Sequence, residues 1–140
     1  MCLRSHNAQR CCSDLVRHSL RVTVTAADLV SRARSTHPRI AAVVDEHLDD
    51  NEDELLLHLL VADFRRQART AHESHDFALR EPVLALLDWG IVEGDEALDN
   101  AIAVSFVEDS AWWEPGQDGY LATWPPALTA ELQRQRRRRT

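Results

Sequence analysis

Apolar residues in the middle of the chain recur every three or four positions, which is the spacing of one face of an α-helix. The longest stripe lies within residues 52–72, with the acid-rich stretch DDNEDE at its start and three Arg at its end. This charge order suits the dipole of a helix. A shorter stripe lies within residues 38–48. The two stripes predict amphipathic helices that bury Leu57, Leu60, Val61, Phe64, Ala68 and Ala71 in one case and Ile40, Val43, Val44 and Leu48 in the other.

Residues typical of helix starts support an earlier helix and the helix at 38–48. Thr25 is followed three positions later by Asp28, which is the pattern of a capping box. Pro38 suits a first helical turn, where its missing N–H costs little. Only residues 20–24 alternate apolar and polar side chains, and five residues are thin evidence for a strand.

A further helix is predicted through EPVLALLDWGIVE, residues 81–93. Pro82 falls near its start, Gly94 is a typical C-cap, and Asp95 is a typical N-cap for the helix that follows. That next helix, residues 96–109, is apolar on nearly all sides, and such a helix is buried by its neighbours. The pattern therefore predicts an all-α, single-domain bundle of five to six helices with a central buried helix around 96–109.

The stretch WWEPGQDGYLATWPP breaks the helical pattern with three of the five prolines and two of the four glycines. Loops of this length are commonly functional or mobile. Trp124, followed by two prolines, is expected to fold back as a lid on the bundle. Trp112 and Trp113 either join that lid or form the centre of a protein interface, because Trp within a charged rim is typical of interface hot spots. The predicted partner-binding residues are Trp112, Trp113, Glu108, Asp109, Glu114 and Asp118.

The net charge of −7 is unevenly distributed, and all sixteen basic residues are Arg. Residues 1–44 carry seven Arg against two acids, residues 45–133 carry twenty-one acids against four Arg, and residues 134–140 add five Arg. The acidic body argues against a surface that tracks phosphates and favours a partner with a basic face. A weaker alternative is nucleic-acid contact through the Arg-rich tail.

Composition also suggests the boundaries of the domain. Residues 1–20, which hold all three cysteines, are expected to be a poorly ordered N-terminal extension with free thiols. Residues 21–133 are expected to form the helical domain, and residues 134–140 a basic disordered tail. No apolar run reaches the roughly 18 residues that cross a bilayer, so we expect no membrane contact and a cytoplasmic location.

The histidines are the main candidates for catalytic chemistry. His72 and His75 are three positions apart, His58 follows Glu54 by four, and His47 follows two acids. A zinc site needs three or four converging ligands, and none of these pairs forms a known metal motif. Neither a cofactor nor a metal is therefore expected. A small metal-dependent hydrolase built on these helix-borne histidines and nearby carboxylates is kept as the alternative function.

Residues 86–93 and 95–108, with the sequences LLDWGIVE and DEALDNAIAVSFVE, resemble a family of small uncharacterised bacterial helical domains. The later WPPAL resembles the closing helix of that family, and the resemblance covers residues 25–132. Such domains are similar to immunity proteins of bacterial toxin systems, which bind and block a toxin. The resemblance implies no catalytic residue and no cofactor. It leads to the main hypothesis, a non-enzymatic acidic protein-binding module of immunity type that acts on a basic, toxin-like partner.

Overall fold

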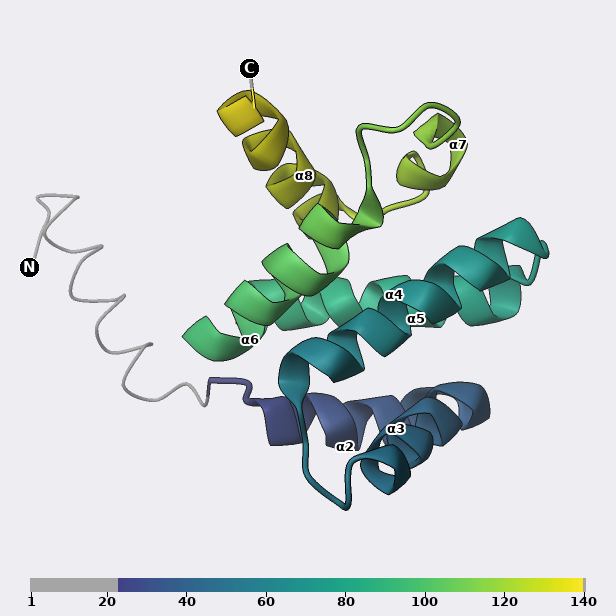
Figure 1. The fold of residues 1–140 in the computed structure, drawn as a ribbon, viewed down its shortest axis with the longest axis vertical. Helices are drawn as coiled ribbons and strands as arrows, with labels where there is room; N and C mark the ends of the chain where they lie inside the picture. The colour runs from purple at the N-terminus through teal and green to yellow at the C-terminus, as the bar shows by residue number, and fades with distance from the viewer. Residues whose placement is uncertain (1–22, 140) are drawn as a thin grey trace, which may run out of the picture.

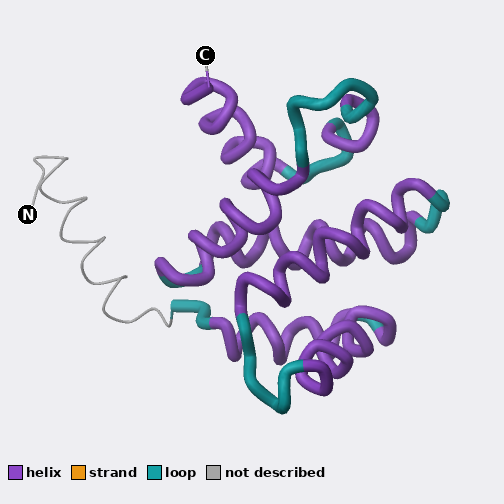
Figure 2. Tube along the Cα trace, viewed as in Figure 1, coloured by secondary structure: helices purple, strands orange, loops and turns teal. Residues whose placement is uncertain are grey.

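The computed structural model of the chain describes residues 23–139, so the predicted extension at 1–20 lies outside the described residues. Within residues 23–139 the chain forms seven α-helical segments and no strand (Figure 2). This confirms the all-α, single-domain prediction. The number of segments exceeds the predicted five to six because the aromatic loop contains a short helix, α7 (Asp118–Leu121).

The first two described helices pack against each other at one end of the molecule (Figure 1). The predicted capping box starts α2 (Ala26–Thr36): the Asp28 N–H donates to the Thr25 hydroxyl, and the Thr25 N–H donates to the Asp28 carboxylate. Helix α3 (Pro38–Asp50) begins with its proline at the first helical position, as predicted. Of the alternating stretch at 20–24, the structure describes residues 23 and 24, which form no strand; Val24 forms only an isolated bridge to Gly94.

Helix α4 (Leu57–Glu73) starts five residues later than the predicted helix at 52–72. Glu52 and Asp53 have φ angles of 55° and 66°, a left-handed conformation that a right-handed helix does not contain. These two acids therefore make the turn that brings the chain back after α3. The predicted stripe of α4 is confirmed at Leu60, Val61, Phe64, Ala68 and Ala71, which are buried, whereas its first member, Leu57, is only partly buried.

Helix α5 (Phe77–Glu93) starts earlier than the predicted 81–93, because Asp76 caps it by accepting a hydrogen bond from the Leu79 N–H. Pro82 consequently lies inside the helix and not near its start. Gly94 ends the helix, as predicted. A Cβ atom built on Gly94 would lie 2.3 Å from the carbonyl oxygen of Gly90, so only glycine fits this close turn.

The predicted central helix is buried but is not a uniform α-helix. It consists of α6 (Glu96–Ile102), a π-helical turn at Ala103–Val107 and a 3₁₀ turn at Glu108–Ser110. Side chains from other helices take two of its carbonyls in the π turn: Arg65 donates to the Ser105 oxygen and Gln135 to the Ala103 oxygen. Its fully buried apolar side chains are Leu98, Ala101, Ile102, Phe106 and Val107.

The last helix, α8 (Pro126–Arg139), includes most of the segment expected to be disordered. That expectation is wrong for residues 134–139. Asp88 of α5 caps the helix, since its Oδ1 accepts hydrogen bonds from the N–H groups of Ala127 and Leu128 at 2.9 and 3.0 Å. Leu128 and Leu132 then bury one side of the helix in the core, and the Arg-rich end continues from it.

The helices are arranged in order along the longest axis (Figure 1). Helices α2 and α3 lie at one end, α4, α5 and α6 occupy the middle, and α7 and α8 lie at the other end. Among the described residues, no helix is long and apolar enough to cross a membrane. This arrangement places the aromatic loop and the Arg-rich end of α8 together, far from the α3–α4 turn.

Candidate functional site

The aromatic loop holds its rings at different depths. Trp124 is only 6% exposed and packs on Phe106, with ring centroids 4.9 Å apart. The buried Tyr120 meets Trp124 edge to face at 5.8 Å. Trp124 therefore closes the core as the predicted lid.

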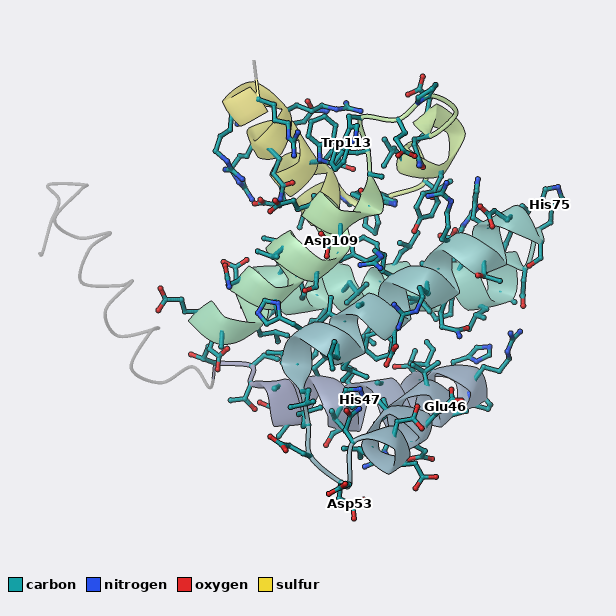
Figure 3. The ribbon with its side chains drawn as sticks, viewed as in Figure 1. Glu46, His47, Asp53, His75, Asp109 and Trp113 are labelled. Carbon is teal, nitrogen blue, oxygen red and sulfur yellow. The ribbon has the colours of Figure 1, made fainter. Side chains whose placement is uncertain are left out.

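Trp112 and Trp113 point in different directions, and only Trp113 is presented to solvent. Trp112 is partly buried and packs against the hydrophobic core, whereas Trp113 is 50% exposed. The two rings meet edge to face, with centroids 5.4 Å apart and planes at 82°. Because the core holds Trp112, this contact holds Trp113 in a defined orientation. Figure 3 shows Trp113 beside α8, above Asp109.

The Arg-rich end of α8 lies against the Trp pair. The Arg139 guanidinium sits 4.5 Å from the ring centroid of Trp113 and 5.6 Å from that of Trp112, and Arg136 sits 5.7 Å from Trp112. These distances fall within the range of cation–π contacts. In the sequence the Trp pair and the Arg-rich tail are separate features, and the structure brings them into contact.

All four acids predicted for the partner-binding surface are exposed. Asp109 lies 3.5 Å from Arg65, while Glu108, Glu114 and Asp118 form no ion pair with any residue of the described chain. The structure thus brings together on one segment, residues 108–118, an exposed aromatic ring and four exposed carboxylates. Whether this segment binds a partner stays a prediction.

A cavity of about 290 Å³ opens beside this segment, between α4 and the loop. Three guanidinium groups of α4 line one side, from Arg65, Arg66 and Arg69, and the other side is lined by Asp109, Glu114, Gln117 and Tyr120, among others. From the sequence, these three Arg were expected only to complement the dipole of the helix. Their spacing of three and four residues did indicate that they share one face of α4, but the loop that faces them has no signal in the sequence.

Four buried side-chain atoms of the described residues have no hydrogen-bond partner: the indole nitrogens of Trp112 and Trp124, and two atoms of residues that line this cavity. The two at the cavity are Oε1 of Gln117, a residue 4% exposed, and the hydroxyl oxygen of Tyr120, a residue 3% exposed. Burial raises the pKa of Tyr120 to about 12, and the smaller effects of the Trp124 indole and the Arg69 guanidinium oppose it. Tyr120 is therefore a neutral hydroxyl at neutral pH. Buried polar groups without partners are uncommon in folded proteins and call for an explanation.

The four histidines of the alternative function do not converge, although His75 lies next to His72, with its Nδ1 3.4 Å from the His72 carbonyl oxygen. His47 is buried and accepts a hydrogen bond from the Leu56 N–H, so it supports the turn before α4. His58 forms a hydrogen bond with Ser105 at 2.8 Å. Figure 3 shows His47 and His75 at well-separated places in the molecule.

His72 occupies a third environment, against the ring of Tyr120 and 3.1 Å from an Arg80 nitrogen. Burial lowers the pKa of His72, and the positive charges of Arg80 and Arg69 lower it further. Within residues 23–139, no three His, Cys, Asp or Glu side chains come close enough to share one metal ion. The hydrolase alternative therefore has no converging set of ligands in this part of the chain.

Comparison with protein families gives one match: a model described as "Domain of unknown function (DUF7674)" matches residues 30–139. No curated protein matches the chain, and no solved structure does. The matched range includes the segment 108–118, the cavity and the Arg-rich end of α8. This match agrees with the resemblance of residues 25–132 to an uncharacterised family of small helical domains.

Proposed function

We propose that this chain, which belongs to the DUF7674 family of domains of unknown function, is a non-enzymatic binding module of immunity type that engages a basic partner protein. One observation carries the proposal: Trp113 is half exposed, braced by Trp112, and set in a segment with four exposed acids. An oriented aromatic ring within a charged rim has the composition of an interface hot spot.

The contact between Arg139 and Trp113 indicates what chemistry this ring accepts. Its face already holds a guanidinium at 4.5 Å within the chain, and half of the residue remains open. An Arg or Lys of a partner reaching the open part of Trp113 would gain a cation–π contact of about 0.5–2 kcal/mol. The carboxylates of Glu108, Glu114 and Asp118 would then face the partner's other basic residues.

The charge of the whole body supports a basic partner at longer range. Seven exposed acids lie on the end of α3 and the turn after it: Asp45, Glu46, Asp49, Asp50, Glu52, Asp53 and Glu54. Figure 3 shows Glu46 and Asp53 at the end of the molecule opposite Trp113. In this proposal the acidic turn raises the rate of encounter with a basic protein, while segment 108–118 makes the contact.

The test is affinity capture with the full chain, using lysate of the cells that produce it. We expect a basic protein to be retained at low salt and released as salt rises, because the encounter is electrostatic. Trp113→Ala should abolish retention. Phe77→Ala is the matched control, since Phe77 is 48% exposed and also lies under an Arg, 4.3 Å from Arg80.

A second pair of variants separates the two acidic regions. Changing the four acids of segment 108–118 to amides should lower the affinity at least tenfold. The same change at Asp50, the last residue of α3, and at Glu52, Asp53 and Glu54 of the turn after it should slow association and leave the dissociation rate unchanged. If the Trp113→Ala chain still captures the same protein at full strength, the assignment of the contact surface is wrong. If the captured protein is acidic, the proposed partner class is wrong as well.

A further inference from the structure

We infer that the cavity between α4 and the loop binds a small zwitterionic amino carboxylate, a molecule of amino-acid size with an anionic and a cationic end. This goes beyond the proposed function, because it assigns a small ligand to a cavity that shares only Asp109 and Glu114 with the residues of the proposed protein contact. Four features of the cavity carry the inference: its free guanidinium donors, its rim of carboxylates, its unpartnered buried atoms and its volume.

The guanidinium side of the cavity has N–H donors that make no hydrogen bond within the described chain. Arg69 donates to Glu73 through Nε alone, so its two terminal nitrogens make no hydrogen bond to any described residue. Arg66 uses one terminal nitrogen for Asp63. A planar guanidinium with two adjacent free N–H groups matches a carboxylate in a bidentate pair. The α4 wall is therefore suited to the carboxylate end of a ligand.

The opposite side of the cavity is suited to a cation. Glu114 and Asp109 line it with exposed carboxylates; Glu114 has no ion pair within the described chain, and Asp109 lies 3.5 Å from Arg65. The buried Oε1 of Gln117 is an acceptor without a donor. An ammonium group carries three N–H donors, so it can face the two carboxylates and, after a shift of the Gln117 side chain that uncovers its buried Oε1, satisfy that oxygen as well.

Buried polar atoms without a hydrogen-bond partner in the chain indicate a site where a ligand supplies the missing hydrogen bonds. Leaving a buried acceptor without a donor costs about 1–3 kcal/mol. Both Gln117 and the Tyr120 hydroxyl have that defect at the same cavity. The loop reaches this position through Ala111, whose φ of 58° is a strained conformation for a residue other than glycine. Strain and missing hydrogen bonds at one place are typical of a binding site.

The size of the cavity limits the ligand. Pockets for drug-sized molecules span about 300–1,000 Å³, and this one, at about 290 Å³, is at the lower end. A folded peptide is too large for it. A simple anion would use the guanidinium side and leave the Glu114 carboxylate and the Gln117 oxygen without a partner. A molecule with both charges close together uses both sides.

The experiment measures ligand binding to the dialysed full chain by thermal shift and calorimetry. The probes are the twenty amino acids, with alanine compared directly to propionate, which lacks the ammonium group, and inorganic phosphate as a third class. We expect at least one amino acid to raise the melting temperature and bind at least tenfold more tightly than its counterpart without the ammonium group. Equal affinity for an amino acid and for its counterpart without the ammonium group would overturn the zwitterion assignment. Binding of inorganic phosphate alone would overturn it as well. No shift with any probe would overturn the site.

Three variants locate the binding. Gln117→Leu keeps the size of the side chain but removes the acceptor, so it should weaken the bound amino acid at least tenfold while leaving the unliganded chain as stable as before or more so. Arg69→Gln should weaken binding at least tenfold, and Arg69→Lys less, because Lys keeps the charge but not the bidentate geometry. Arg34→Gln is the matched control, since Arg34 pairs with Asp45 on the surface away from the cavity. Equal affinity in all variants would place the ligand elsewhere.

Discussion

Asp88 connects α5 to α8, and its removal tests how the Arg-rich helix is held in place. Its Oδ1 accepts hydrogen bonds from two backbone N–H groups in the first turn of α8, at 2.9 and 3.0 Å. No residue next to α8 in the sequence supplies this cap. The proposed change is Asp88→Ala, with Asp88→Asn as the matched control, because Asn keeps an oxygen acceptor of the same shape and loses only the charge.

The expected cost follows from the number and type of bonds lost. Hydrogen bonds to a charged group contribute about 1.5–3 kcal/mol each when well protected, and loss of a helix cap costs about 0.5–2 kcal/mol. Asp88 is partly exposed, so water replaces part of the loss. We expect Asp88→Ala to lower the free energy of unfolding by about 2 kcal/mol and the melting temperature by roughly 8 °C. Asp88→Asn loses only the charge–dipole contribution, about 0.5 kcal/mol.

Urea unfolding followed by circular dichroism gives the free energies, and amide hydrogen exchange gives their location. In Asp88→Ala the protection of residues 126–139 should fall more than that of α4 and α5, because α8 detaches first. If the Ala and Asn variants have the same unfolding free energy within about 0.3 kcal/mol, the cap does not stabilise α8. Uniform loss of protection across all helices would refute the local role of Asp88.

Three further outcomes are expected. Gly94→Ala should lower the free energy of unfolding in urea by about 1–3 kcal/mol, because the new Cβ would lie 2.3 Å from a carbonyl oxygen of α5. Gly119→Ala is the control: a Cβ at Gly119 has no atom within 4 Å, so the free energy of unfolding should stay equal or rise slightly. Arg139→Gln should increase iodide or acrylamide quenching of tryptophan fluorescence, since it uncovers one face of Trp113; unchanged quenching would contradict the stacking. Burial and neighbouring Arg side chains lower the pKa of His72 in the folded chain below the usual 6.5, so protonation of His72 favours the unfolded state. The urea midpoint should therefore fall as the pH drops from about 6.5 through the lowered pKa. His72→Gln should remove this contribution to the pH dependence.

The candidate site was predicted only in part. Trp113 and the acids of segment 108–118 were identified from their types and spacing, and the structure places them together in an exposed position. The guanidiniums of α4 and the unpartnered Gln117 were missed. They come from segments about fifty residues apart, and nothing in either segment indicates that it faces the other.

The sequence by itself determined what depends on near neighbours. Apolar spacing of three and four residues, the capping box at Thr25 and the cap at Asp95 predict helices correctly because their hydrogen bonds and packing faces lie within one or two turns. The excess of acids between residues 45 and 133 is likewise a property of composition alone.

Only the tertiary structure decided the features in which distant segments complete each other. Asp88 caps a helix forty residues later, so residues 134–139 continue α8 instead of forming a free tail. Arg65 and Gln135 bind carbonyls of the central segment, which forms a π turn where periodicity predicts a plain helix. The physical reason is the same in each case: a backbone N–H or C=O is satisfied by a side chain from elsewhere in the fold, and the local sequence carries no information about that partner.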